Sequence, residues 1–328
     1  MADLAAAEGP LLGQILDASY PLWHEGLSRR AYERYYAAQV ATPWGRQHLR
    51  RFALVEGTEV VSSAKEYTFA ATLDKEPIRA TGIGGVFTQP AHRGRGHAAA
   101  VIERLLDRAT ERRDDLALLF SEIGTDYYAR LGFEPIPTAD VALRVAESTR
   151  RGAPATLVRF AEDRDLADIV ATGESRAAPF RFHLNRDRDL VHYAISRKRV
   201  MAGLSPPGAR EVQFFIAEEG ASAVAYVVIT ARRGADARTE SILDECGDRD
   251  PAGARVGAIL QALIARDPAE IRPSIRTRLP AGFCPPQITL FDERPCAQVM
   301  MVRPLSDRAR AALPLRGEDV LFWHGDRF

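Results

Sequence analysis

The segment Val86–Ala98 contains the residues best suited to bind an anion. Its sequence, VFTQPAHRGRGHA, follows a run typical of a strand and leads into an amphipathic helix. The first turn of a helix has backbone N–H groups without partners and carries about half a positive charge from the helix dipole. Gly94 and Gly96 let an anion approach those groups, while Arg93 and Arg95 add positive charge. The segment therefore predicts an anion site, and a pyrophosphate is the anion we expect.

Two common phosphate motifs explain this segment less well. A P-loop requires a Lys followed by Ser or Thr, and the segment supplies neither at the required place. The letters GRGHAA do satisfy GxGxxA, but a dinucleotide site also needs an acidic residue at the end of the next strand. Asp114 and Asp115 come before that strand instead, so the sequence disfavours a dinucleotide site.

A longer block around the segment resembles the GNAT N-acyltransferase superfamily. The block contains a strand, PxxRGxG, an amphipathic helix, a short strand and then TDYYARLGF, and it covers about residues 45–145. The resemblance implies that the RGxG amides bind the diphosphate of acetyl-coenzyme A, and that the preceding strand binds its pantetheine arm. Ala91 departs from the Gln or Arg that many members carry there. The expected coenzyme-binding residues are Val86, Phe87, Thr88, Arg93, Gly94, Arg95, Gly96, His97 and Ala98.

The same resemblance gives candidate catalytic residues. Tyr128 matches the family's tyrosine near the thioester sulfur, and a phenol of pKa about 10 can protonate a departing thiolate. Packing of that ring between helix and sheet is the alternative for Tyr128. The resemblance also implies that a backbone N–H near Gly84–Phe87 holds the oxyanion.

The general base is less defined, because the strand IRATGIGGVFT lacks the glutamate that many relatives carry. Glu122 is one candidate, and ion pairing at the surface is its alternative role. The carboxylate of Phe328, at the end of the aromatic segment LFWHGDRF, is another. Cys246, Cys284 and Cys296 all lie in the second half, so direct transfer is favoured over an acyl-cysteine intermediate.

Closer likeness points to two groups of GNAT enzymes. GIGGVFTQPAHRGRGHA, SEIGTDYYARLGF, FALVEGTEVVSSAKEY and the late AYVVI look like the fungal lysine N6-acetyltransferases, which acetylate free lysine. SE followed by YxRLGF also looks like the tandem-GNAT acetyltransferases of the enhanced intracellular survival type. In that type the second copy is degenerate and the C-terminal carboxylate takes part in catalysis.

The elements that must position these residues can be predicted from apolar spacing. Residues 48–56 and 60–70 form a predicted hairpin around Gly57, and residues 78–88 a third strand whose glycines mark a bulge or a close approach. Ala98, Val101, Ile102, Leu105 and Ala109 lie on one face of a helix from about 94 to 112. Helices are also predicted within residues 11–41, with a break at Pro21, and at 125–131, 163–173 and 251–265; further strands are predicted at 116–120, 141–145, 156–160, 212–218, 223–230 and 240–243.

The second half repeats this order loosely after a polar, Gly- and Pro-containing stretch at 148–154. We expect an α/β (α+β) tandem GNAT-like fold, with a mixed central sheet flanked by helices. Residues 1–150 would form the catalytic domain and residues 155–328 a degenerate copy. That copy would close the acceptor pocket and bind no coenzyme A, because Asp248 and Asp250 replace the basic loop. Asp244, Glu245 and Asp292 could bind a cationic amine there, but solvated surface acids are the favoured interpretation.

Composition excludes several classes of protein. The 328 residues include 44 Lys+Arg and 44 Asp+Glu, and this zero net charge argues against nucleic-acid and anionic-membrane partners. We expect no metal site, no disulfide framework, no signal peptide and no membrane span, and hence a soluble cytoplasmic protein. The sequence leaves homo-oligomer formation open.

Together these features predict an acetyl-CoA-dependent N-acetyltransferase acting on a small amine such as free lysine. Two alternatives stay open. One is acetylation of an aminoglycoside, a peptide or a protein lysine. The other is a catalytically silent acyl-CoA-binding regulatory protein.

Overall fold

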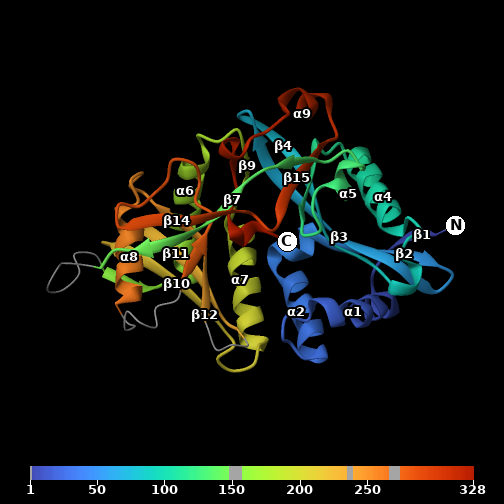
Figure 1. Cartoon of the computed structure of the whole chain (residues 1–328), viewed down its shortest axis with the longest axis horizontal. Helices are drawn as coiled ribbons and strands as arrows, with labels where there is room; N and C mark the ends of the chain where they lie inside the picture. The colour runs from blue at the N-terminus through green and yellow to red at the C-terminus, as the bar shows by residue number, and fades with distance from the viewer. Residues whose placement is uncertain (1, 148–156, 235–238, 266–273) are drawn as a thin grey trace.

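Two mixed β-sheets lie side by side in the computed structural model, with helices packed on their faces (Figure 1). The structure describes residues 2–147, 157–234, 239–265 and 274–328. These residues include no helix with the length and apolar character needed to cross a membrane. The expected α/β fold with mixed sheets is confirmed.

The first sheet is built mainly from the N-terminal half of the chain. Its strands are β1 (Asp3–Ala6), β2 (Leu49–Glu56), β3 (Glu59–Leu73), β4 (Glu76–Thr88), β5 (Leu116–Ser121), β15 (Val299–Pro304) and β6 (Glu134–Ile136), in that order, with β9 (Phe182–Leu184) and β16 (Val320–Leu321) attached through β3. The predicted hairpin around Gly57 forms between β2 and β3. The associated helices are α1 (Gly9–Trp23), α2 (Arg29–Ala41), α3 (Pro43–His48), α4 (His97–Glu111), α5 (Asp126–Ala129) and α9 (Asp307–Ala312).

The second sheet has the order β14 (Ile288–Pro295), β7 (Ala139–Val145), β13 (Ile275–Thr277), β12 (Thr239–Asp248), β11 (Ser222–Arg233), β10 (Arg210–Glu219) and β8 (Leu157–Phe160). Helices α6 (Leu166–Ala177), α7 (Arg188–Leu204) and α8 (Ala254–Ile264) belong to this half. Figure 1 shows α7 near the middle of the molecule, next to α2 of the other half.

The two sheets exchange strands. β7 pairs with β13 and β14 of the second sheet, whereas β15 inserts between β5 and β6 of the first. The expected boundary at 148–154 lies outside the described residues. Division of the chain into residues 1–150 and 155–328 therefore stays a proposal, and these exchanged strands connect any two such units.

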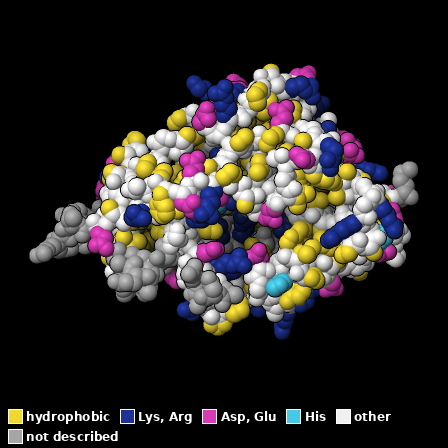
Figure 2. All heavy atoms as spheres, viewed as in Figure 1, with side chains coloured by type: hydrophobic (Ala, Val, Ile, Leu, Met, Phe, Trp, Pro, Cys, Tyr) yellow, Lys and Arg dark blue, Asp and Glu magenta, His cyan; other side chains and the backbone are white. Residues whose placement is uncertain are grey.

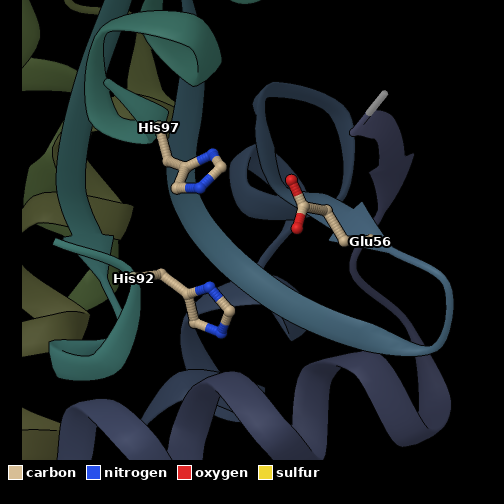
Figure 3. A group of neighbouring side chains, drawn as sticks. All are labelled: Glu56, His92 and His97. Atoms are coloured by element: carbon tan, nitrogen blue, oxygen red, sulfur yellow. The ribbon is translucent and has the colours of Figure 1, made fainter. Parts of the chain in front are cut away.

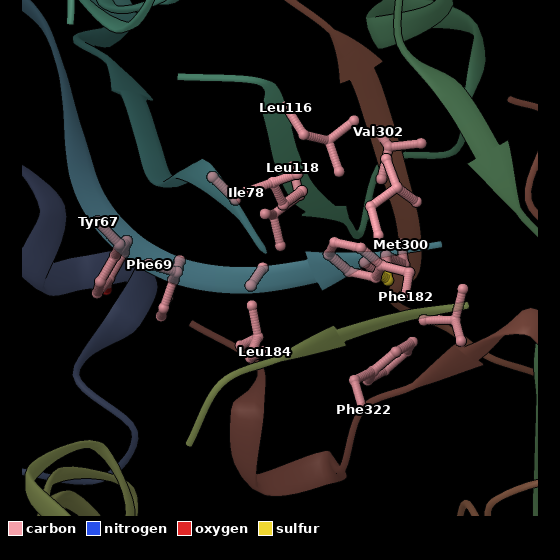
Figure 4. Packing of buried hydrophobic residues seen from close by; sticks show 14 of the residues in the cluster. Tyr67, Phe69, Ile78, Leu116, Leu118, Phe182, Leu184, Met300, Val302 and Phe322 are labelled. Carbon is pink, nitrogen blue, oxygen red and sulfur yellow. The ribbon is translucent and has the colours of Figure 1, made fainter. Parts of the chain in front are cut away.

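A shared hydrophobic core reinforces this connection (Figure 4). Phe182 and Met300 are each 1% exposed, and they belong to the same cluster as Ile78 and Leu118 of the first half. Burying a large apolar side chain contributes about 1.5–3 kcal/mol. Contacts among these residues thus hold the second half against the first sheet.

The amphipathic helix expected after the glycine loop is confirmed as α4. Val101, Ile102, Leu105 and Ala109 are 0% exposed and pack against the first sheet. The expected break at Pro21 is wrong, because α1 continues to Trp23. Proline fixes a φ that a helix accepts, but it removes one N–H bond and its ring crowds the carbonyl of residue i−4. Accordingly α1 ends two residues after Pro21.

Candidate active site

Strands β4 and β5 separate part-way along their length. They pair in parallel only from Ala80 to Gly82, opposite Leu116 to Leu118. Beyond Gly82, β4 continues to Thr88 against β3, while β5 continues to Ser121 against β15. The separation leaves one edge of β4 open to a ligand, because its main-chain groups on that side have no strand partner among the described residues.

A β-bulge lies on this open part of β4. Ser63 pairs with Phe87 and Lys65 with Gly84, so Gly85 and Val86 both stand opposite a single residue of β3. Gly85 has a φ of 55°, a conformation that glycine adopts at little cost. The predicted bulge is confirmed, and it redirects main-chain groups at the place where the oxyanion donor is expected.

The C-terminal residue Phe328 approaches the other two glycines. A β-carbon placed on Gly82 would lie 2.5 Å from Cζ of Phe328, and one on Gly84 would lie 3.0 Å from its carbonyl oxygen. The Phe328 ring also lies 4.5 Å from Tyr67 and 5.3 Å from Phe120, measured between ring centroids. The expected close approach is thus confirmed, and its partner is the end of the chain itself.

A cavity of about 610 Å³ opens at this place between the two halves. Figure 2 shows a hollow near the middle of one face, with basic and acidic side chains at its rim. Of the predicted site residues, Val86, Glu122, Tyr128 and Phe328 line the cavity together. The other walls come from α1, α2, α7 and β10–β12, through residues that include Trp23, Tyr35, Met201, Arg210, Thr230 and Ile242.

Tyr128 is held by the short helix α5 and the turn after it. Its carbonyl oxygen accepts hydrogen bonds from the amides of Leu131 and Phe133, and Gly132 completes the turn with a φ of 77°. Burial, with smaller effects from Tyr127 and Glu122, raises the pKa of Tyr128 to about 12. The phenol therefore stays protonated near neutral pH and can act as an acid.

The two carboxylates proposed as bases have different surroundings. Glu122 is exposed, accepts a hydrogen bond from Nε2 of Gln298, and borders both this cavity and an adjoining one of about 830 Å³. Phe328 lies deeper, against Gly84, and Arg197 donates hydrogen bonds to the carbonyl oxygens of Gly325 and Arg327 just before it.

The expected anion loop lies at the far end of β4, outside the cavity. Gly94 and Gly96 have φ values of 75° and 81°, and a β-carbon on either would meet open space. Gly96 caps α4 without any side-chain hydrogen bond. Glycine is therefore favoured at both positions by the positive φ and not by a close neighbour, and the open space beside them can admit an anion. Arg93, Arg95, His97 and Ala98 surround this helix start, and Thr88 precedes it on β4.

The corresponding helix start in the second half is already occupied by a carboxylate. Asp248 is buried, and its side chain accepts hydrogen bonds from the amides of Arg255 at 2.8 Å and Val256 at 3.3 Å. An internal acid thus takes the place that an external anion would need at the start of α8.

Two of the three acids suggested as ligands for a cationic amine differ from their expected surroundings, whereas Asp292 is exposed as expected. Asp244 and Glu245 are 3% and 1% exposed, so the favoured interpretation as surface acids is wrong for both. Asp244 is paired with Lys198, and Glu245 with Arg186. Asp292 is paired with Arg276 and Arg294.

Three cationic residues of the cavity, Arg51, Lys65 and Arg197, were not predicted from the sequence. Arg51 and Lys65 sit within β2 and β3, and Arg197 lies on α7, a helix that the apolar spacing did not indicate. The available signal was a charged residue inside each apolar strand, in HLRRFALVE and VVSSAKEYTF. Burial, with Arg51 and Arg197 nearby, lowers the pKa of Lys65 to about 7.

One group of side chains has the composition of a metal site. Glu56, His92 and His97 offer ligand atoms that lie within 4.8 Å of one another, and all three point into the same space (Figure 3). Nε2 of His92 also lies 3.0 Å from the carboxylate of Glu59. His92 and His97 both lie beside the start of α4.

Trp23 and Trp44 have separate roles. Trp23 lines the cavity, with its ring 5.8 Å from that of Phe87. Trp44 is 3% exposed and belongs to the shared core. Of the described residues that line the cavity, none is a cysteine.

Comparison with known proteins agrees with this geometry. Residues 21–136 match the family model for the acetyltransferase (GNAT) domain. No curated protein matches the chain in sequence.

Solved structures match most of the chain at low identity. A GCN5-related N-acetyltransferase from Anabaena variabilis has a TM-score of 0.68 at 12% identity, covering 93% of this chain and 73% of its own. Eis1 from Mycobacterium abscessus has a TM-score of 0.56 at 15% identity, with coverages of 95% and 76%. N-myristoyltransferase from Saccharomyces cerevisiae, solved with myristoyl-CoA, has a TM-score of 0.53 at 9% identity, with coverages of 89% and 79%. The chain therefore contains a GNAT acetyltransferase domain at residues 21–136 and is an acyltransferase.

Proposed function

We propose that this protein transfers an acetyl group from acetyl-CoA directly to a primary amine of a small molecule. The side-chain amine of free lysine is the acceptor favoured by the likeness in sequence. The observation that carries the proposal is the convergence of Tyr128, Phe328 and the open edge of β4 in one cavity. No single segment of the chain could supply that combination.

The residues on β4 and α4 fit an acyl-CoA. The open edge of β4 from Val86 to Thr88 offers main-chain groups to a pantetheine amide, and it leads toward the start of α4. There the open space above Gly94 and Gly96 suits a diphosphate. The yeast N-myristoyltransferase, which shares the fold, was solved with myristoyl-CoA.

The reaction then requires three groups. The neutral amine attacks the thioester carbonyl carbon, and a main-chain N–H at the Gly85 bulge stabilises the resulting oxyanion. A carboxylate accepts the proton that the amine loses. When the C–S bond breaks, Tyr128 donates its proton to the sulfur and is later reprotonated from solvent.

Phe328 is the better placed of the two candidate bases. Its main chain lies against Gly84, next to the bulge, whereas Glu122 is exposed and engaged by Gln298. We therefore assign proton acceptance to the carboxylate that Phe328 carries in this chain. Glu122 is left with a role at the mouth of the cavity.

The second half, in this proposal, shapes the acceptor site and holds no coenzyme. Helix α7 and strands β10–β12 form walls of the cavity, and Asp248 fills the start of α8. Residues 155–328 would thus act as a degenerate copy that completes the catalytic domain at residues 1–150.

Thiol release tests the function. Incubation with acetyl-CoA and a panel of amines, followed with a thiol reagent, should show release that depends on the amine. Initial velocities should give intersecting lines, because both substrates bind before transfer. Binding of acetyl-CoA without release for any amine would overturn the proposal, and parallel lines would overturn the direct route.

A further inference from the structure

We propose that Arg51, Lys65 and Arg197 form a carboxylate-binding subsite, so that the acceptor is a primary amine that also carries a carboxylate group. The inference rests on the proposed function, because it assigns the cavity beside Tyr128 to the acceptor. It concerns the class of acceptor and would survive any change in the identity of the base.

Arg51 is a buried cation in the wall of the cavity. Its side chain lines the cavity, yet the residue is only 4% exposed. Within the described residues, neither Nε nor Nη2 of Arg51 has a hydrogen-bond partner, and the residue has no acidic partner. A buried guanidinium without a counter-ion is strongly unfavourable, so a carboxylate that enters the cavity beside Arg51 would be stabilised by its charge.

Lys65 brings a second charge to the same place. Its head lies 5.9 Å from the centre of the Tyr36 ring, and the Arg51 head lies 5.7 Å from the same ring. The strand register pairs Lys65 with Gly84, whose other neighbour is Phe328. The charge is therefore next to the reaction site.

Arg197 adds a third charge from the second half. Its bonds to the carbonyl oxygens of Gly325 and Arg327 fix it in place but leave its charge uncompensated. All three side chains line the same cavity, and both arginines lower the pKa of Lys65. The two halves thus share one cationic cluster.

The acids of the cavity do not neutralise this cluster. Asp244 pairs with Lys198 at 2.6 Å, and Glu25 pairs with Arg210 at 2.6 Å. Two carboxylates remain. Glu122 is exposed at the mouth of the cavity and accepts a hydrogen bond from Gln298, and the carboxylate of Phe328 is assigned to the proton. An arriving carboxylate would supply the missing negative charge, and Arg can bind it through two parallel hydrogen bonds.

The cluster also argues against other acceptors. An aminoglycoside or a polyamine brings several ammonium groups, which these three cations would repel at short range. An amino acid brings one amine to the thioester and one carboxylate to the cluster. The zero net charge of the whole chain hides this local excess.

Lysine and cadaverine provide a matched pair for the test, because they differ only in the carboxylate group. With acetyl-CoA, kcat/KM for lysine should exceed that for cadaverine by about ten-fold or more, the range for a hydrogen bond to a charged group. Equal values for the two amines would overturn the subsite and leave the proposed function intact. Thiol release with neither amine, nor with any other, would instead overturn the function.

Variants locate the effect. Arg51→Gln and Lys65→Met should each lower the ratio of kcat/KM for lysine to kcat/KM for cadaverine, mainly because KM for lysine rises. The affinity for acetyl-CoA should be retained. Arg50→Gln and Lys75→Met are the matched controls, since both residues are exposed and line neither cavity. If Arg51→Gln fails to fold, as its melting temperature would show, Lys65→Met decides alone. An unchanged ratio in a folded Lys65→Met variant would overturn the assignment.

A carboxylate could also arrive on the acyl group. Succinyl-CoA with cadaverine tests this source, because it places the carboxylate on the donor. If kcat/KM for succinyl-CoA with cadaverine is lower than for acetyl-CoA with lysine, the result supports the acceptor subsite. If kcat/KM for succinyl-CoA with cadaverine is higher, and Lys65→Met removes this advantage, the cluster would be assigned to the acyl chain. That result would overturn the inference about the acceptor.

Discussion

The main chain of Phe328 lies against Gly84, so closely that a β-carbon on Gly84 would stand 3.0 Å from the Phe328 carbonyl oxygen. This relationship explains why a strand in the middle of a sheet contains glycines at 82 and 84. The absence of side chains there makes room for the end of the chain. Phe328 and this part of β4 therefore line the same cavity.

Replacing Gly82 with alanine should displace this end of the chain. The new β-carbon would lie 2.5 Å from Cζ of Phe328, so the ring must move. Displacement of a catalytic group by about an ångström can lower kcat about a hundred-fold. We expect a loss of at least about ten-fold in kcat with acetyl-CoA binding retained. Gly13→Ala, at a helical position with open space, is the control and should keep full activity.

The carboxylate and the ring of Phe328 can be tested separately. One glycine added after Phe328 keeps the ring and moves the carboxylate by about 3.5 Å. Phe328→Ala keeps the carboxylate and removes the ring. We expect the added glycine to lower kcat by about ten-fold or more, as for loss of a general base. Deletion of the last three residues should do the same, and full activity in that deletion would remove Phe328 from the mechanism.

Tyr128→Phe should lower kcat by about ten-fold or more, because the departing thiolate loses its proton donor. KM for acetyl-CoA should change little. Since the pKa of Tyr128 is raised to about 12, the wild-type profile should show no loss of the acid below about pH 10. Tyr127→Phe is the matched control, because Tyr127 does not line the cavity. Unchanged turnover at saturating substrates would contradict the role of Tyr128.

The local sequence pattern was sufficient to predict the helix and the strands next to the motifs. The spacing of Val101, Ile102 and Leu105 specifies α4, because only one face of the helix is apolar. Gly57 marks the turn of the hairpin. The expected coenzyme loop and Tyr128 could therefore be placed from sequence, since both lie at the ends of such elements.

The acceptor side of the cavity could not be predicted in this way. In α7 the buried residues lie between Leu190 and Ile195, in the first half of the helix. A polar run at 196–199 separates them from the apolar residues at its end, so periodicity is weak. Arg51 and Lys65 lie on strands buried on both faces, where a charged residue looks like part of a solvated face. β15 pairs with β5, which lies far from it in the sequence. The local sequence pattern of a strand does not indicate which distant strand will pair with it.

Protein stability should depend on pH through Lys65. Its pKa is lowered to about 7 from 10.5, so between these values the unfolded chain binds a proton that the folded chain does not. Stability contributed by this group therefore rises as pH increases above about 7. Chemical denaturation of the wild type and Lys65→Met between about pH 7 and about pH 9 should show a smaller upward slope in the variant. Parallel curves would indicate that Lys65 has an ordinary pKa.

Acceptor preference should depend on pH through the same group, with the opposite sense. Lys65 binds a carboxylate only in its charged form. The groups facing it are Arg51 on β2, Arg197 on α7, Tyr36 on α2 and the carboxylate of Phe328 beside Gly84. Neither arginine titrates near neutral pH, nor does Tyr36, whose pKa burial raises. The lysine-to-cadaverine ratio of kcat/KM should therefore fall as pH rises through about 7, because this ratio cancels the shared deprotonation of the attacking amine. In Lys65→Met the ratio should be low and flat across this range. A ratio that stays constant with pH in the wild type would show that Lys65 does not contact the carboxylate.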